Sequence, residues 1–148
     1  MFEKGSLIYF TPFRFRDGRP AKDKFFLILK VFDESLIIAG LPSSQNYFPT
    51  SLQKEIGCLK NENIDLGCYV FDSKEIVGEN GFYFPKKTIV YGQYLDIFEK
   101  QTIISSYPIQ SVDYTLVDKL KKEIVEELVA CFLTATNVKR KIKRALVT

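Results

Sequence analysis

The sequence predicts a mainly β protein with a C-terminal helical segment, and three observations carry this prediction. Short apolar runs alternate with breaks that contain Gly, Pro and Asp, which is typical of short strands. Phe and Tyr, which favour strands, make up 14% of the 148 residues. After Pro108 the apolar residues recur at helical spacing. We therefore expect one domain: a small, strongly curved barrel of about six or seven strands over 1–110, and a helical segment over 111–148.

Two apolar runs form the centre of the predicted barrel. The run 24–32 is apolar at nearly every position, as in a strand that is buried on both faces. Asp33 and Glu34 predict a tight turn into the second run, 35–40. We expect this second strand to carry a polar tetrad to the rim of the sheet, and we take that rim as the candidate functional edge. The tetrad is Pro42, Ser43, Ser44 and Gln45.

The N-terminal region combines a first strand with a basic segment. Residues 6–10 predict the strand, and 12–16 alternates apolar and basic residues. In an extended chain this alternation places the side chains of Arg14 and Arg16 on one face. The sequence Asp-Gly-Arg-Pro at 17–20 then predicts a turn before the central hairpin.

Further strands are predicted in the second half of the barrel, at the segments 56–58, 67–71, 82–84, 88–90 and 95–98. The second of these is the clearest, whereas the region 50–66 is polar and poorly periodic. Asn80 and Gly81 suit a hairpin turn with positive φ.

The C-terminal segment predicts two helices. The spacing of apolar residues indicates a first helix over 115–133, with Thr115 and Asp118 resembling a capping box. Asn137 is a candidate cap for a second, short helix. This helix has one apolar stripe, surrounded by five of the 21 basic residues. The stripe can pack on the barrel, while the cations lie in water or contact nucleic acid or a membrane. The apolar residues are Val138, Ile142, Ala145 and Leu146, and the basic ones are Lys139, Arg140, Lys141, Lys143 and Arg144.

Composition limits the chemistry of the chain. Without a single His, the sequence excludes His acid–base catalysis, His-dependent nucleophiles and His-ligated metals. Three cysteines cannot form a four-thiolate zinc site, so we expect no metal and no cofactor. Their odd number and the lack of a signal peptide indicate a reducing cytoplasm, with Cys58 and Cys68 as small buried hydrophobes rather than a disulfide. No apolar run reaches the length of a membrane span, so no membrane partner is expected.

The order of features resembles the MazF/PemK-like toxins, which are mRNA endoribonucleases on an SH3-like barrel shared with the gyrase poison CcdB. The resemblance covers roughly residues 5–45: a Gly before the first strand, a loop ending in Arg19-Pro20, a buried strand, and a strand ending in hydroxyls and Gln45. It implies that Arg19 stabilises the phosphate being cleaved and that Ser43 or Ser44 assists. It also implies a homodimer opposed by an acidic antitoxin.

The chemistry agrees with these residue types. When the RNA 2′-hydroxyl attacks, the protein needs only to hold the phosphate in line and to stabilise its added charge. Arginine offers a permanently charged, bidentate donor for this purpose. The leading hypothesis is therefore a metal-independent endoribonuclease that cleaves single-stranded RNA. The expected RNA-binding residues are Arg14, Arg16, Lys22, Lys24, Gln45 and Tyr47.

Other interpretations remain open at this stage. Arg19-Pro20 can simply form part of a turn, and Arg14 and Arg16 can lie on the solvent-exposed face of an edge strand. The two serines can form hydrogen bonds with backbone groups at the end of a strand. The alternative function is a non-catalytic SH3-like module that binds nucleic acid or protein, including a CcdB-like enzyme poison.

Overall fold

The computed structural model describes residues 2–41, 55–61, 63 and 65–147. These residues form a mainly β structure with two antiparallel sheets and three α-helices, one of them C-terminal. The strands are β1 (Ser6–Phe13), β2 (Lys22–Phe32), β3 (Ser35–Gly40), β4 (Gly57–Asn61), β5 (Leu66–Phe71), β6 (Thr88–Tyr91), β7 (Leu95–Glu99) and β8 (Tyr114–Lys119). The helices are α1 (Lys100–Ser106), α2 (Lys122–Leu133) and α3 (Arg140–Val147), with a short 3-10 helix, η3 (Gly92–Tyr94).

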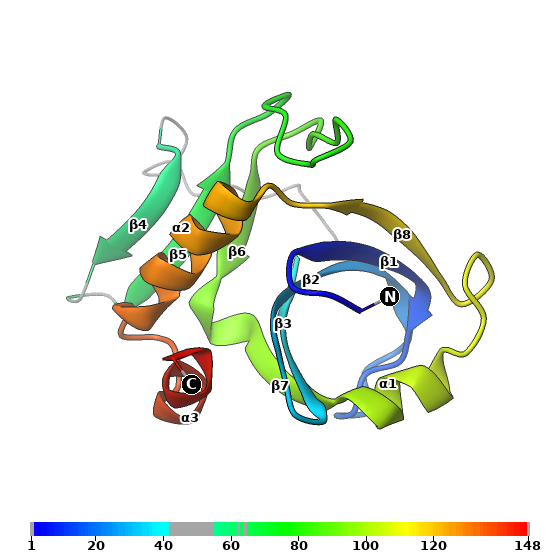
Figure 1. Cartoon of the computed structure of the whole chain (residues 1–148). Helices are drawn as coiled ribbons and strands as arrows, with labels where there is room; N and C mark the ends of the chain where they lie inside the picture. Colours follow the sequence, from blue (N-terminus) through cyan, green and yellow to red (C-terminus); the bar gives the residue numbers. More distant parts are fainter. Residues whose placement is uncertain (1, 42–54, 62, 64, 148) are drawn as a thin grey trace.

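The larger sheet has the strand order β7-β3-β2-β1-β8 and is strongly curled (Figure 1). Helix α1 and the loop after it connect its two edge strands. The smaller sheet has the order β4-β5-β6, and α2 packs against β5. Segment η3 links the two sheets, because it lies between β6 and β7 in the chain.

The centre of strand β2, at 26–29, is buried on both faces, as its apolar run predicts. The side chains of Phe26 and Ile28 join a core with α1 residues, whereas Leu27 and Leu29 join a second core with α2 and α3. Alternate residues of one strand thus enter two different cores, which requires an apolar residue at every position. The turn at Asp33 is confirmed, with a φ of 47°.

The prediction of a helix over 115–133 is wrong for its first part. Residues 114–119 form β8, whose Thr115 pairs with Tyr9 of β1, and α2 begins only at Lys122. The predicted capping box is also wrong, because Thr115 is an exposed residue of a strand and does not precede a helix. A short apolar pattern fits the period of a helix as well as that of a strand. Residues 114–119 form a strand because the backbone groups at the edge of β1 need hydrogen-bond partners.

The other strand predictions are largely confirmed. An edge strand forms at Gly57–Asn61, and β5, β6 and β7 cover the segments expected at 67–71, 88–90 and 95–98. The segment 82–84 makes only an isolated bridge, between Ile76 and Tyr83. Helix α1 was not predicted because Ile103 is its single buried residue, so it carries no amphipathic pattern.

Helix α3 packs through its predicted apolar stripe. Val138, Ile142 and Leu146 are buried, and the Lys30 Nζ donates to the Leu146 carbonyl. The self-packing interpretation of the C-terminal stripe is therefore confirmed. Asn137 is not the cap of this helix, which begins at Arg140. Its Nδ2 instead donates to the carbonyl of Gly67 over 2.9 Å.

The cysteine prediction is partly wrong. Cys58 on β4 forms a disulfide with Cys131 on α2, across 73 residues, while Cys68 is a free, buried cysteine as expected. The pairing depends on α2 lying over β5, next to β4, which no sequence spacing reveals. The cysteines therefore give no support to the expectation of a reducing compartment. Among the residues that the structure describes, no helix is long and apolar enough to cross a membrane.

Asp118 stabilises the segment before β6. Its buried carboxylate accepts hydrogen bonds from the backbone N–H groups of Asn80, Phe82 and Lys119. Burial disfavours the charge, but these bonds outweigh it and hold the pKa of Asp118 below its ordinary value of 3.8. The carboxylate thus stabilises the fold above pH 3.8, and this contribution is lost as the pH falls through the lower pKa of the folded state.

We expect Asp118→Asn to lower the free energy of unfolding at pH 7 by about 2 kcal/mol, since charged hydrogen bonds are lost. Urea unfolding at pH 7 and at acid pH measures the effect. The difference from wild type should shrink in acid, where the wild-type carboxyl is itself protonated. Glu79→Gln, an exposed neighbouring change, is the control. Equal pH profiles for Asp118→Asn and wild type would contradict this account.

Candidate anion-binding groove

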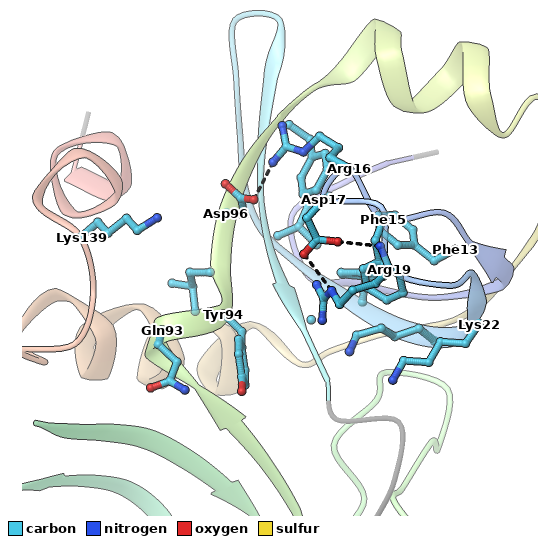
Figure 2. A pocket seen from close by; sticks show the side chains of 16 residues that line it. Phe13, Phe15, Arg16, Asp17, Arg19, Lys22, Gln93, Tyr94, Asp96 and Lys139 are labelled. Carbon is cyan, nitrogen blue, oxygen red and sulfur yellow. Dashed lines mark hydrogen bonds and ion pairs between the residues drawn. The ribbon is translucent and has the colours of Figure 1, made fainter.

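A groove of 680 Å³ opens between the β1–β2 connection and the η3–β7 segment. We call it the basic groove, because cations from three parts of the chain line it. Figure 2 shows the β1–β2 residues on one side, with Gln93, Tyr94 and Asp96 facing them. The cations are Arg16, Arg19, Lys22, Lys24 and, from the segment before α3, Lys139.

Arg19 is held at the wall of the groove by its own turn. The Asp17 carboxylate accepts a 3.1 Å bond from the Arg19 backbone N–H and a 2.8 Å bond from its Nε. The guanidinium carbon lies 4.3 Å from the centre of the Phe15 ring. The side-chain contacts use the Nε edge and the face of the guanidinium, and among the described residues neither Nη group has a hydrogen-bond partner. These hydrogen bonds from Arg19 lower the pKa of Asp17.

The Arg16 side chain connects the two walls. Its Nη2 forms an ion pair of 2.5 Å with Asp96 of β7, and its guanidinium lies 4.0 Å above the Phe98 ring. The positive charge of Arg16 is therefore balanced, and its role in the groove is to fix one wall against the other. Both side chains of the pair are more than half exposed, so the pair itself adds little stability.

The pKa of Lys24 indicates that positive charge gathers in the groove. Burial lowers the pKa of this half-buried lysine, and the positive charges of Lys22 and Arg19 lower it further. Lys24 is thus close enough to Lys22 and Arg19 for their positive charges to repel its own. An anion bound among them would relieve this repulsion, which makes the site suited to a phosphate.

The structure brings together four of the residues expected to act on RNA: Arg16, Arg19, Lys22 and Lys24. Arg14 lies outside the groove, where its guanidinium lies 4.5 Å above the Tyr107 ring and donates to the Ser106 carbonyl. The expected alternation is kept, since Phe13 and Phe15 are covered while Arg14 and Arg16 are exposed, but β1 ends at Phe13 and the two arginines make different contacts. Four further candidates, Ser43, Ser44, Gln45 and Tyr47, lie outside the described residues, so their roles stay predictions.

Sequence reasoning missed the opposite wall of the groove. Gln93 and Tyr94 lie between the strands expected at 88–90 and 95–98, and Asp96 is expected only as part of the second strand. Their signal is the polar break Gly-Gln-Tyr between two apolar runs, at 92–94. Lys139 was assigned to the basic tail, and its place at the groove follows only from the packing of α3 near β7.

Comparisons with protein-family models, with curated proteins and with solved structures found no match to this chain. Within the described residues, no group of three or more His, Cys, Asp and Glu could hold a metal ion. The side chains of the groove offer two guanidinium groups, three ammonium groups and nearby aromatic rings.

The RNA binding expected from the sequence predicts that Lys139→Gln weakens the affinity for RNA a few-fold and reduces its salt dependence. Losing one phosphate contact lowers the slope of log K against log salt by roughly 0.7 for a single strand. Fluorescence anisotropy with a labelled RNA octamer over a salt series measures both quantities. Lys86→Gln, an exposed cation that does not line the groove, is the control. An unchanged slope for Lys139→Gln would show that this lysine makes no phosphate contact.

Proposed function

We propose that the basic groove binds single-stranded RNA and that the protein is a metal-independent endoribonuclease of the MazF/PemK class, on an SH3-like barrel. One observation carries the proposal: Arg19, Lys22 and Lys24 line one groove, where burial lowers the pKa of Lys24 and the two neighbouring positive charges lower it further. RNA supplies the repeated phosphates that such a cluster attracts. Single-stranded RNA is favoured over a duplex because aromatic side chains line the same groove.

The proposed reaction uses the nucleophile of the RNA itself. The 2′-oxygen loses its proton to water and forms a bond to phosphorus as the bond from phosphorus to the 5′-oxygen breaks. The leaving 5′-oxygen takes a proton from water, so the products are a 2′,3′-cyclic phosphate and a 5′-hydroxyl. Negative charge grows on the non-bridging oxygens in the transition state, and the Nη groups of Arg19 would donate to them. In this proposal Ser43 or Ser44 supplies a further donor. Lys22 and Lys24 would hold the neighbouring phosphates.

The test is incubation of a mixed single-stranded RNA with the protein in EDTA. Fragments that end in a 2′,3′-cyclic phosphate support the endoribonuclease. A complete absence of fragments over a broad panel of RNA sequences would overturn it.

A second candidate is a module that binds nucleic acid or protein without cutting. It is favoured by the two carboxylates of the groove, Asp17 and Asp96, which already engage Arg19 and Arg16. Such compensation suits moderate, salt-sensitive binding more than strong charge stabilisation. RNA binding that weakens steeply with salt and yields no fragments would favour this candidate. Co-purification of a topoisomerase subunit, again without RNA cleavage, would point instead to a CcdB-like poison.

The partners of the proposed enzyme are a second copy of the chain and an acidic antitoxin, in the cytoplasm. A dimer would place two basic grooves on one RNA-binding surface. An acidic antitoxin segment would compete with RNA for the same cations, since carboxylates and phosphates pair with Arg and Lys in similar ways.

A further inference from the structure

We propose that Tyr94 is a stacking platform for one RNA base and that Gln93 beside it contacts the edge of that base. This inference rests on the proposed function and extends it, because it explains how the groove distinguishes nucleic acid from other polyanions. The two residues form part of η3, opposite the cations of the β1–β2 connection (Figure 2).

The exposure of Tyr94 is the first argument. Tyr94 lines the groove and is 53% exposed. The rings of Phe13, Phe26 and Phe98 line the same groove but are buried. Phe15 is covered by cations, with the Arg19 guanidinium 4.3 Å from its centre. Among the described lining residues, Tyr94 therefore offers the most accessible aromatic ring.

The position of Tyr94 is fixed by its surroundings, which is the second argument. The Tyr91 ring meets the Tyr94 ring edge to face, with centroids 5.8 Å apart. Gly92 is buried so tightly that a Cβ there would lie 2.6 Å from the Asn137 Oδ1 and 2.7 Å from a methyl of Val138. Leu95, on the other side of Tyr94, is also buried. A ring held in this way loses little conformational entropy when a base stacks on it.

The two walls of the groove differ in chemistry, which is the third argument. The β1–β2 wall offers Arg19, Lys22 and Lys24, which suit phosphates of any sequence. The η3 wall offers an aromatic face and the amide of Gln93. This amide can donate and accept hydrogen bonds and so can pair with a base edge. A single strand lying along the groove would direct its phosphates to the first wall and one base to the second.

The experiment compares two ligands of similar charge on the wild type and three variants. The ligands are a single-stranded RNA octamer that contains 2-aminopurine and an inorganic polyphosphate, which has no bases. Tyr94→Ala should weaken RNA binding about tenfold, since stacking is worth roughly 1–3 kcal/mol per base. Tyr94→Phe should retain the affinity and the quenching of 2-aminopurine fluorescence. Polyphosphate binding should not change in either variant.

Tyr83→Ala is the matched control, because Tyr83 is 47% exposed but does not line the groove. Wild-type affinity of Tyr94→Ala for RNA would overturn the stacking role. So would an equal loss of RNA and polyphosphate binding, which would mean general damage to the groove. RNA that binds in a Tyr94-dependent way but is never cleaved would overturn the endoribonuclease alone. If wild type binds no RNA at all, both proposals fail.

Discussion

Arg19→Ala should lower the rate of RNA cleavage by about 100- to 1000-fold, the typical cost of removing one donor to a developing negative charge. Nε of Arg19 is bound to Asp17, so within the described part of the chain the Nη groups are the donors of its guanidinium that can meet a ligand. Arg19→Lys should also be severely impaired, since an ammonium group cannot form a bidentate contact with two phosphate oxygens. Single-turnover cleavage of a labelled RNA measures the effect.

Arg14→Ala is the matched control for this experiment. Arg14 is an exposed arginine five residues earlier, and it contacts Tyr107 and the Ser106 carbonyl outside the groove. We expect its cleavage rate to stay close to wild type. Thermal unfolding of Arg19→Ala should be little changed, because the Arg19–Asp17 ion pair is exposed. An Arg19→Ala variant that cleaves as fast as wild type would remove Arg19 from the reaction.

Reduction of the disulfide should lower the free energy of unfolding by about 4 kcal/mol, because the bond closes a loop of 73 residues in the unfolded chain. The bond also ties the edge strand β4 to α2, which packs on the neighbouring strand β5. Guanidinium unfolding with and without a reductant measures the difference. We expect the groove to keep its RNA affinity, since neither cysteine lines it.

Cys58→Ala is the control that isolates the bond. Cys58 lies on an exposed position of β4, so alanine there leaves no cavity, and Cys131 remains as a buried thiol. This variant should match reduced wild type in stability and should not respond to reductant. Cys68→Ala should keep its response to reductant, because Cys68 is free. Equal stability of oxidised and reduced wild type would mean that the bond contributes nothing to the fold.

The sequence by itself determined much of the β structure. An apolar run that is continuous in β2 requires burial on both faces, and the breaks at Asp33 and Gly81 mark turns in any context. The apolar stripe of α3 likewise required a surface to cover it. These features depend on local patterns, and the local chain carries enough information to fix them.

Tertiary structure alone decided the features that depend on distant contacts. Residues 114–119 became a strand because β1 offered an unpaired edge, and Cys58 met Cys131 because α2 lies over the smaller sheet. The candidate site divides in the same way. The cations of the β1–β2 connection are neighbours in the sequence and could be predicted as a cluster. Tyr94 and Lys139 join them only because η3 and α3 are packed beside that cluster. No local pattern in the sequence indicates which surfaces pack together.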